Sequence, residues 1–145
     1  MRTCWLIIML LSYMSCYSQK TEEDVCLSNI MKMNSDIQQG KVNTRHIKVF
    51  LDCFIDHTNN VEILEFRNSV LFKLMEYCPE EFICLMSKKN TDILSNVCQN
   101  IENPIHDNIN LYKIYNQILI TSSDSDVKTE ILDSLKEAIA KNNSK

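Results

Sequence analysis

The stretch VEILEFRNSVLFKLMEYCPEEFICLM, residues 61–86, decides the fold of this chain. Its apolar side chains recur three and four positions apart, which is the spacing of one face of an α-helix. In the first part these positions are Ile63, Phe66, Val70, Leu71, Leu74 and Tyr77. Pro79 and the two glutamates after it are typical of a first helical turn, where proline's missing N–H is not needed and acidic groups complement the helix dipole. The stretch therefore predicts a helix from about Val61 to Tyr77 and a short second helix that begins at Pro79. The second helix carries Phe82, Ile83, Leu85 and Met86.

Two helices are predicted before this stretch. Thr21 and Asp24 have the spacing of a capping box, and the helix that begins there ends near Gly40. Another helix begins after Asn43-Thr44 and ends at the polar turn 57–60. Its apolar stripe consists of Ile47, Phe50, Leu51, Phe54 and Ile55.

Three helices are predicted after residues 61–86. Asn90 or Thr91 caps the first of them, and Asn103-Pro104 ends it, since the residue before a proline disfavours the helical conformation. We expect Asp107 to cap the next helix. The polar run 121–126 then leads into the last helix.

The near absence of glycine supports a wholly helical fold. Gly40 is the only glycine, the chain has two prolines, and neither Asn-Gly nor Asp-Gly occurs in it. A β-protein of this size needs such dipeptides at its hairpin turns. The expected fold class is therefore all-α, with about seven short helices. Short loops make neighbouring helices antiparallel.

The spacing of the predicted helices resembles that of HEAT or armadillo helical repeats over roughly residues 43–140. Helices begin about 17 residues apart in places, near residues 44, 61, 91, 108 and 125. The resemblance rests on helix length and spacing alone, because no repeat consensus recurs and the tetratricopeptide pattern is missing. It implies stacked helix pairs, and an irregular helical bundle is the alternative.

The N-terminus has the layout of a secretory signal. Arg2 precedes the unbroken apolar run 4–11, and residues 12–18 are mostly small and polar. The run is well short of the roughly 20 apolar residues that span a bilayer. We predict that residues 1–18 are a signal peptide cleaved after Ser18, and that the protein is exported to a periplasm or secreted.

Lipidation of Cys16 is the alternative interpretation of the same leader. Residues 11–16 resemble a lipobox, although Tyr13 stands where a small aliphatic residue is expected. In that case the mature chain begins at Cys16 and is anchored to a membrane as a lipoprotein.

The mature chain divides into three predicted parts. These are an N-terminal helix and linker at 19–42, a helical domain at 43–141 and a disordered tail at 142–145. Loss of the leader removes only Arg2 from the charged residues, which leaves 14 basic and 19 acidic side chains and a net charge of −5. Lys88-Lys89 is the only adjacent basic pair. This distribution excludes nucleic acid as an expected partner.

Five cysteines remain after the leader, and their number is odd. They are Cys26, Cys53, Cys78, Cys84 and Cys98. Export permits disulfides, but at least one thiol must then stay reduced or pair with another chain. No C-x-x-C motif occurs among them. The other interpretation is that most of them are small core residues.

Cys53 and His57 are the pair from which a zinc or copper site would have to be built. They are four positions apart on the predicted helix, so they can lie on one side. His46 is about 10 Å from Cys53 along the axis, too far to share a metal. Further ligands would have to come from another helix, and we expect no metal or cofactor.

Catalytic motifs are missing from the sequence. His106 precedes Asp107, but the carboxylate is better explained as a helix cap than as half of an acid–base pair. The paired acids Glu22-Glu23 and Glu80-Glu81 stand at helix N-termini. No serine lies in a G-x-S-x-G motif. We expect no catalytic residues and no enzyme.

Aromatic and methionine side chains indicate a protein-binding face. They are Tyr77, Met86, Tyr112 and Tyr115. Such residues are enriched at interfaces, and stacked helices present extended surfaces. The predicted function is a protein–protein interaction module whose partner is an unknown protein. The alternatives are a helical carrier of a small apolar ligand and, less favoured, a metal-dependent enzyme using Cys53 and His57.

Overall fold

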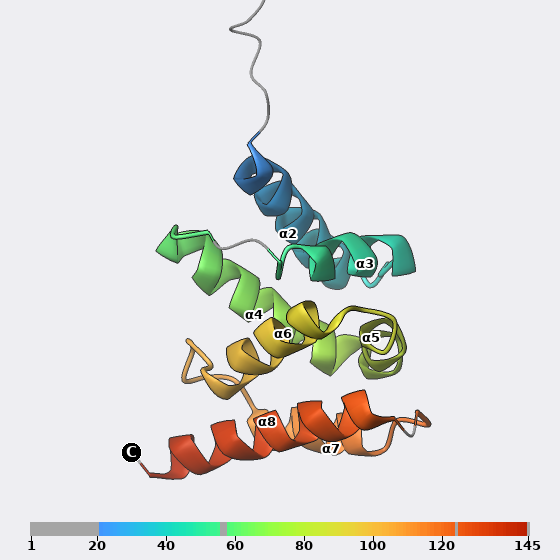
Figure 1. The fold of residues 1–145 in the computed structure, drawn as a ribbon, viewed down its shortest axis with the longest axis vertical. Helices are drawn as coiled ribbons and strands as arrows, with labels where there is room; N and C mark the ends of the chain where they lie inside the picture. The colour runs from blue at the N-terminus through green and yellow to red at the C-terminus, as the bar shows by residue number, and fades with distance from the viewer. Residues whose placement is uncertain (1–20, 56–57, 124, 145) are drawn as a thin grey trace, which may run out of the picture.

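The computed structural model describes residues 21–55, 58–123 and 125–144 of the chain. Within these ranges it contains seven helices and no strand, so the predicted all-α class is confirmed (Figure 1). The helices are α2 (Glu22–Gln38), α3 (Thr44–Asp52), α4 (Val61–Tyr77), α5 (Pro79–Met86), α6 (Thr91–Glu102), α7 (Leu111–Leu119) and α8 (Asp126–Asn143).

Side-chain caps fix most of the helix starts. The Thr21 hydroxyl accepts a hydrogen bond from the Asp24 N–H at 3.2 Å, and the Asp24 carboxylate accepts from the Thr21 N–H at 3.1 Å, so the predicted capping box is confirmed. Asn90 caps α6, and Pro79 occupies the first turn of α5. Gly40 follows α2 at φ +65°, a conformation that glycine adopts without strain.

The predicted cap at Asp107 is wrong. Helix α7 begins at Leu111, and the Asn110 side chain accepts a hydrogen bond from the Lys113 N–H at 3.0 Å. The connection from α6 is longer than predicted because Ile109 packs against the core before the helix begins. Asp107 is exposed in this loop.

Helix α3 ends earlier than the apolar stripe predicts. Asp52 is its last residue, and the Phe54 and Ile55 N–H groups donate to carbonyls three positions back, which forms a tighter turn. This turn places Phe54 in the core, where it is 1% exposed. Ile55 is 48% exposed, so its assignment to the buried stripe is wrong.

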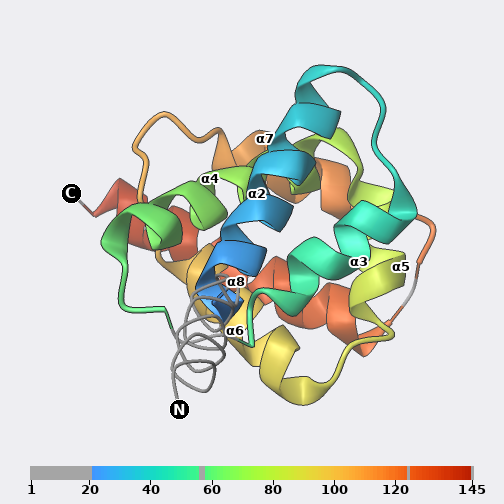
Figure 2. The same ribbon diagram turned by 90° about the horizontal axis from the view of Figure 1, so that it is seen from above.

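The helices form successive layers along the long axis. Figure 1 shows α2 and α3 at one end, α4, α5 and α6 in the middle, and α7 and α8 at the other end. Helix α4 contacts α2 on one side and α7 on the other, and α8 packs against α6 and α7. Viewed from above, α2 lies between α3 and α4 (Figure 2). This layering is consistent with a helical-repeat-like architecture.

One hydrophobic core runs through all these layers. Helix α2 contributes Cys26, Ile30 and Met33 to the same cluster as Leu135 and Ala138 of α8. The N-terminal helix thus shares the core of the predicted domain at 43–141. At the other end, α8 continues to Asn143, so the helix includes the first two residues of the predicted tail.

No helix in the described parts of the chain is long and apolar enough to cross a membrane. The predicted signal peptide, with Cys16 and Ser18, lies outside the described residues.

Candidate functional site

Cys53 lies at the C-terminal cap of α3, where it is buried. Its Sγ lies 3.5 Å from the Val49 carbonyl oxygen and 3.7 Å from the Cys26 carbonyl oxygen. His57, its predicted metal-binding companion, lies outside the described residues. Among the residues that the structure does describe, no three His, Cys, Asp or Glu side chains are grouped to hold a metal ion.

Cys26 of α2 is the thiol that faces Cys53. The Cys26 Sγ is 4.0 Å from the Cys53 carbonyl oxygen, so the two residues contact each other reciprocally. A hydrogen bond with the Cys26 thiol raises the pKa of Cys53, and burial raises it further. Arg67 of α4 donates to the Cys53 carbonyl, and its guanidinium carbon lies 4.6 Å from the centre of the Phe54 ring.

The remaining cysteines are distributed over the middle of the fold. Cys78 separates α4 from α5, Cys84 is exposed on α5, and Cys98 is buried on α6. Burial raises the pKa of the Cys98 thiol, although a hydrogen bond with Ser134 of α8 opposes this effect.

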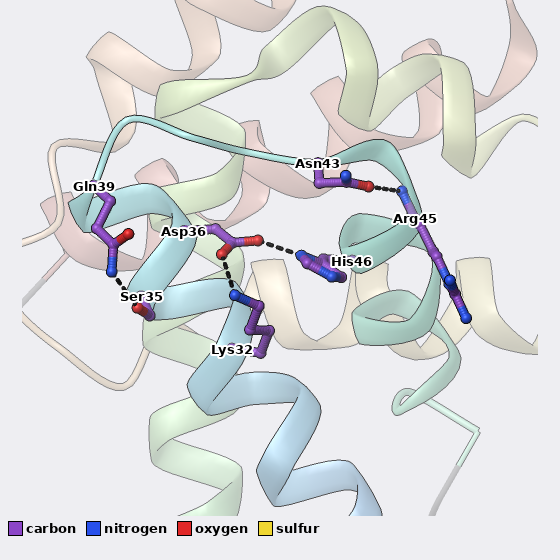
Figure 3. A network of polar contacts seen from close by, with 7 residues as sticks. All are labelled: Lys32, Ser35, Asp36, Gln39, Asn43, Arg45 and His46. Atoms are coloured by element: carbon purple, nitrogen blue, oxygen red, sulfur yellow. Dashed lines mark hydrogen bonds and ion pairs between the residues drawn. The ribbon is translucent and has the colours of Figure 1, made fainter.

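A buried carboxylate joins the end of α2 to the start of α3. Asp36 is 5% exposed, and it accepts hydrogen bonds from His46 Nδ1 and from Lys32 Nζ, the latter at 3.1 Å (Figure 3). The backbone carbonyl of the same residue accepts from the Lys41 N–H at 2.9 Å. Burial alone would raise the pKa of Asp36, but the hydrogen bonds from His46 and Lys32 outweigh it and hold this pKa below its ordinary value.

The Asp36–His46 pair has the form of a carboxylate that orients an imidazole. Catalysis by such a pair requires a nucleophile or substrate group beside the ring. The Ser35 hydroxyl accepts a hydrogen bond from the Gln39 side chain at 3.0 Å (Figure 3). The contact forms a polar joint between α2 and α3. Sequence reasoning missed it because His46 was considered only with Cys53.

Replacing Asp36 by Asn should lower the free energy of unfolding by about 1 kcal/mol at neutral pH. Because the folded-state pKa of Asp36 lies below its unfolded value of 3.8, its contribution is complete above that value. It is lost as the pH falls through the lowered folded-state pKa. Urea unfolding of both proteins at a series of pH values checks this prediction. A difference that stays constant down to about pH 2 would contradict it.

The predicted partner face is only partly at the surface. Tyr112 is 57% exposed, Tyr77 is about half exposed, and Tyr115 is partly buried against the core. Met86 is completely buried, so its assignment to this face is wrong. It shares the inward side of α5 with Phe82 and Ile83, which precede it by four and three positions.

Helix α7 has one side in the core and another at the surface. Leu111, Ile114 and Ile118 are buried. The exposed apolar side chains of this helix are Tyr112, Leu119 and the cap residue Ile120; together with the partly buried Tyr115 we call them the apolar face of α7. Lys113 and Asn116 are also exposed on this helix. Leu119 is 47% and Ile120 is 81% exposed. Sequence analysis named Tyr112 and Tyr115 as candidate partner-face residues and did not name Leu119 or Ile120.

Polar groups surround this apolar face. The Tyr112 hydroxyl accepts a hydrogen bond from the Asn143 side chain of α8 at 3.0 Å. Lys113 forms an ion pair at 2.5 Å with Glu76 of α4, which fixes α7 beside the end of α4. An apolar centre with polar groups around it is the usual composition of a protein interface.

Two surface clefts lie near α4. One of about 520 Å³ is lined by Glu22, Glu23, Cys26, Thr58, Asn59, Asn60 and Ile63. Another of about 420 Å³ is lined mainly by polar side chains, among them Arg67, Asn68, Asn96, Asn100 and Asn103. Several of these asparagines donate to backbone carbonyls, such as Asn96 to Phe54 at 2.7 Å. The amides of Asn68 and Asn96 join separate elements of the fold, whereas those of Asn100 and Asn103 donate to carbonyls of α6.

The chain matches no model of a known protein family, no curated protein and no solved structure. The class that its fold defines is an all-α protein, with seven helices across the described ranges. Its similarity to helical repeats is one of architecture.

Proposed function

We propose that this chain is an exported helical module, without catalytic activity, that binds another protein through the apolar face of α7. The observation that carries this proposal is the exposure of Tyr112, Leu119 and Ile120 at the surface of one helix. Burial of each such side chain against a partner is favourable by about 1–3 kcal/mol. A face of this kind supports association in preference to catalysis.

Export is the second part of the proposal, and the leader at residues 1–18 supports it. The mass of the intact protein from its native host distinguishes the two forms of the leader. A chain that begins at Gln19 is a secreted or periplasmic protein. A chain that begins at an acylated Cys16 is a membrane-anchored lipoprotein.

The carrier alternative has weaker support. A carrier of an apolar ligand needs a largely apolar cavity. The clefts of about 520 and 420 Å³ are lined mainly by carboxylate, hydroxyl and amide side chains. The enzyme alternative depends on Cys53, whose thiol faces another thiol and a backbone carbonyl.

Charge on the apolar face should abolish binding of the partner. The test variant carries Leu119→Glu and Ile120→Glu, and the control carries Met31→Glu and Val61→Glu at exposed apolar positions on α2 and α4. We expect the wild type and the control to recover the same partner protein from native extract. The test variant should recover at least about tenfold less of this partner, because two glutamates cannot be buried in an interface without polar or charged groups to pair with.

Quantitative mass spectrometry of the eluates measures this effect, and circular dichroism verifies that all three proteins are equally helical. An affinity tag belongs at the N-terminus of the mature chain, because Asn143 near the C-terminus contacts Tyr112. Equal recovery by the test variant and the control would overturn the assignment of the face.

A further inference from the structure

Cys26 and Cys53 are the two described thiols whose side chains the fold brings together across 27 positions of sequence. The Sγ atom of each lies within 4.0 Å of the carbonyl oxygen of the other, at 4.0 and 3.7 Å. Both residues are 3% exposed, one in the second turn of α2 and the other at the cap of α3. The sulfur atom of each cysteine thus lies against the backbone of the other, so the two residues are in direct contact.

We propose that Cys26 and Cys53 form a disulfide that fastens α2 to the end of α3. Disulfides join residues whose Cβ atoms are about 4 Å apart, and rotation about the side-chain torsions of two adjacent cysteines brings their sulfur atoms together. This inference goes beyond the proposed binding function and stands independently of it.

The other cysteines have different neighbours. Cys98 forms a hydrogen bond with Ser134 of α8 and lies near Glu102 and Glu130. Cys78 lies near Glu81 at the junction of α4 and α5. Cys84 is exposed on α5. A bridge between Cys26 and Cys53 leaves three further cysteines in the described chain, so at least one of them stays reduced or pairs with another chain.

The oxidant is a small-molecule disulfide, and the cleft of about 520 Å³ gives it a route to Cys26, which lines that cleft. The Cys26 thiolate attacks the oxidant, forms a mixed disulfide and releases one thiol. The Cys53 thiol then passes its proton to the released small-molecule thiolate as its sulfur attacks the Cys26 sulfur and expels the second thiol. Two cysteine thiols are oxidised, the small-molecule disulfide is reduced to two thiols, and the two protons pass to the departing thiolates.

The bridge would secure the terminal layer of the fold. Helix α2 packs mainly against α3 and α4, and its polar joint to α3, at Asp36, lies near its C-terminal end. Cys26 lies near the other end of α2, so the disulfide would hold the end that the joint does not reach. The end units of stacked helical proteins have neighbours on one side only, so they are the first units to detach when the protein unfolds.

Peptide mapping of the full chain tests the pairing directly. After equilibration in glutathione redox buffer, the thiols are alkylated under denaturing conditions and the protein is digested with trypsin. Cleavage after Lys and Arg yields peptides 21–32 and 49–67, which contain Cys26 and Cys53. We expect these two peptides to be linked, and Cys84→Ser to leave the linkage unchanged. Recovery of both peptides fully alkylated, or a bridge between other cysteines, would overturn the proposal.

Thermal unfolding gives a second readout. Closing a loop of this length should raise the melting temperature of the oxidised protein by about 10 °C over that of the reduced protein. Cys26→Ala and Cys53→Ala should each abolish the difference, whereas Cys84→Ser should preserve it. A difference that survives both alanine substitutions would contradict the assignment. If an alanine variant fails to fold, the peptide map of the wild type still decides the question.

Discussion

Substitution of Phe54 by Ala should lower the free energy of unfolding by about 4 kcal/mol, a large part of the stability of a typical domain. Phe54 is 1% exposed, and its ring meets Phe50 edge to face at a centroid distance of 5.6 Å. The Arg67 guanidinium lies over the same ring. Truncation therefore removes buried apolar area, an aromatic pair and a cation–π contact together.

The adjacent residue provides a matched control. Ile55 follows Phe54 in the same turn but is 48% exposed, so Ile55→Ala should lower the free energy of unfolding by less than about 1 kcal/mol. Urea unfolding followed by circular dichroism measures both effects. Similar losses at the two positions would show that the turn after α3 does not direct Phe54 into the core.

Replacement of Asn68 by Leu should lower the free energy of unfolding by about 3 kcal/mol, although leucine is similar in volume and more apolar. The Asn68 amide donates to the Asn100 carbonyl at 2.8 Å and accepts from the Ile105 N–H at 3.2 Å. The Asn100 carbonyl would normally accept from the residue four positions later, which is Pro104 and has no N–H. Asn68 supplies the missing donor, and leucine leaves both backbone groups without their partner.

Asn103 is the control for this substitution. It lies at the end of α6, is exposed, and donates to the Gln99 carbonyl of its own helix at 2.8 Å. Asn103→Ala should lower the free energy of unfolding by less than about 1 kcal/mol in the same urea experiment. An effect of Asn68→Leu as small as that of Asn103→Ala would contradict the bridging role of Asn68.

Sequence analysis predicted the helices well where the signal is local. The limits of α4 and the start of α5 follow from an apolar stripe of period 3.6 and from Pro79, and neither depends on distant residues. The capping box at Thr21 is local in the same sense. The end of α3 and the start of α7 were predicted less well. Both depend on how Phe54 and Ile109 reach a core formed by other helices.

Pairings between helices could not be predicted from one sequence. Cys26 meets Cys53 and Asp36 meets His46 because α2 packs against α3 at one particular angle and register. The prediction that Met86 lies on the partner face was wrong for a similar reason. Helical spacing shows which residues share a side of α5 but not which side faces the core. The two tyrosines of α7 were named as partner-face residues because interface propensity depends on residue type, and that assignment stays a prediction.

Site-specific photo-crosslinking in the native host tests the central claim, that the apolar face of α7 contacts another protein. A photoreactive benzoylphenylalanine replaces Leu119 in one strain and the exposed Met31 of α2 in a second strain. We expect irradiation of the first strain to crosslink the chain, through position 119, to one protein that mass spectrometry identifies. Irradiation of the second strain, with the photoreactive residue at position 31, should give no such adduct. The same adduct from both positions, or no adduct at position 119, would contradict it.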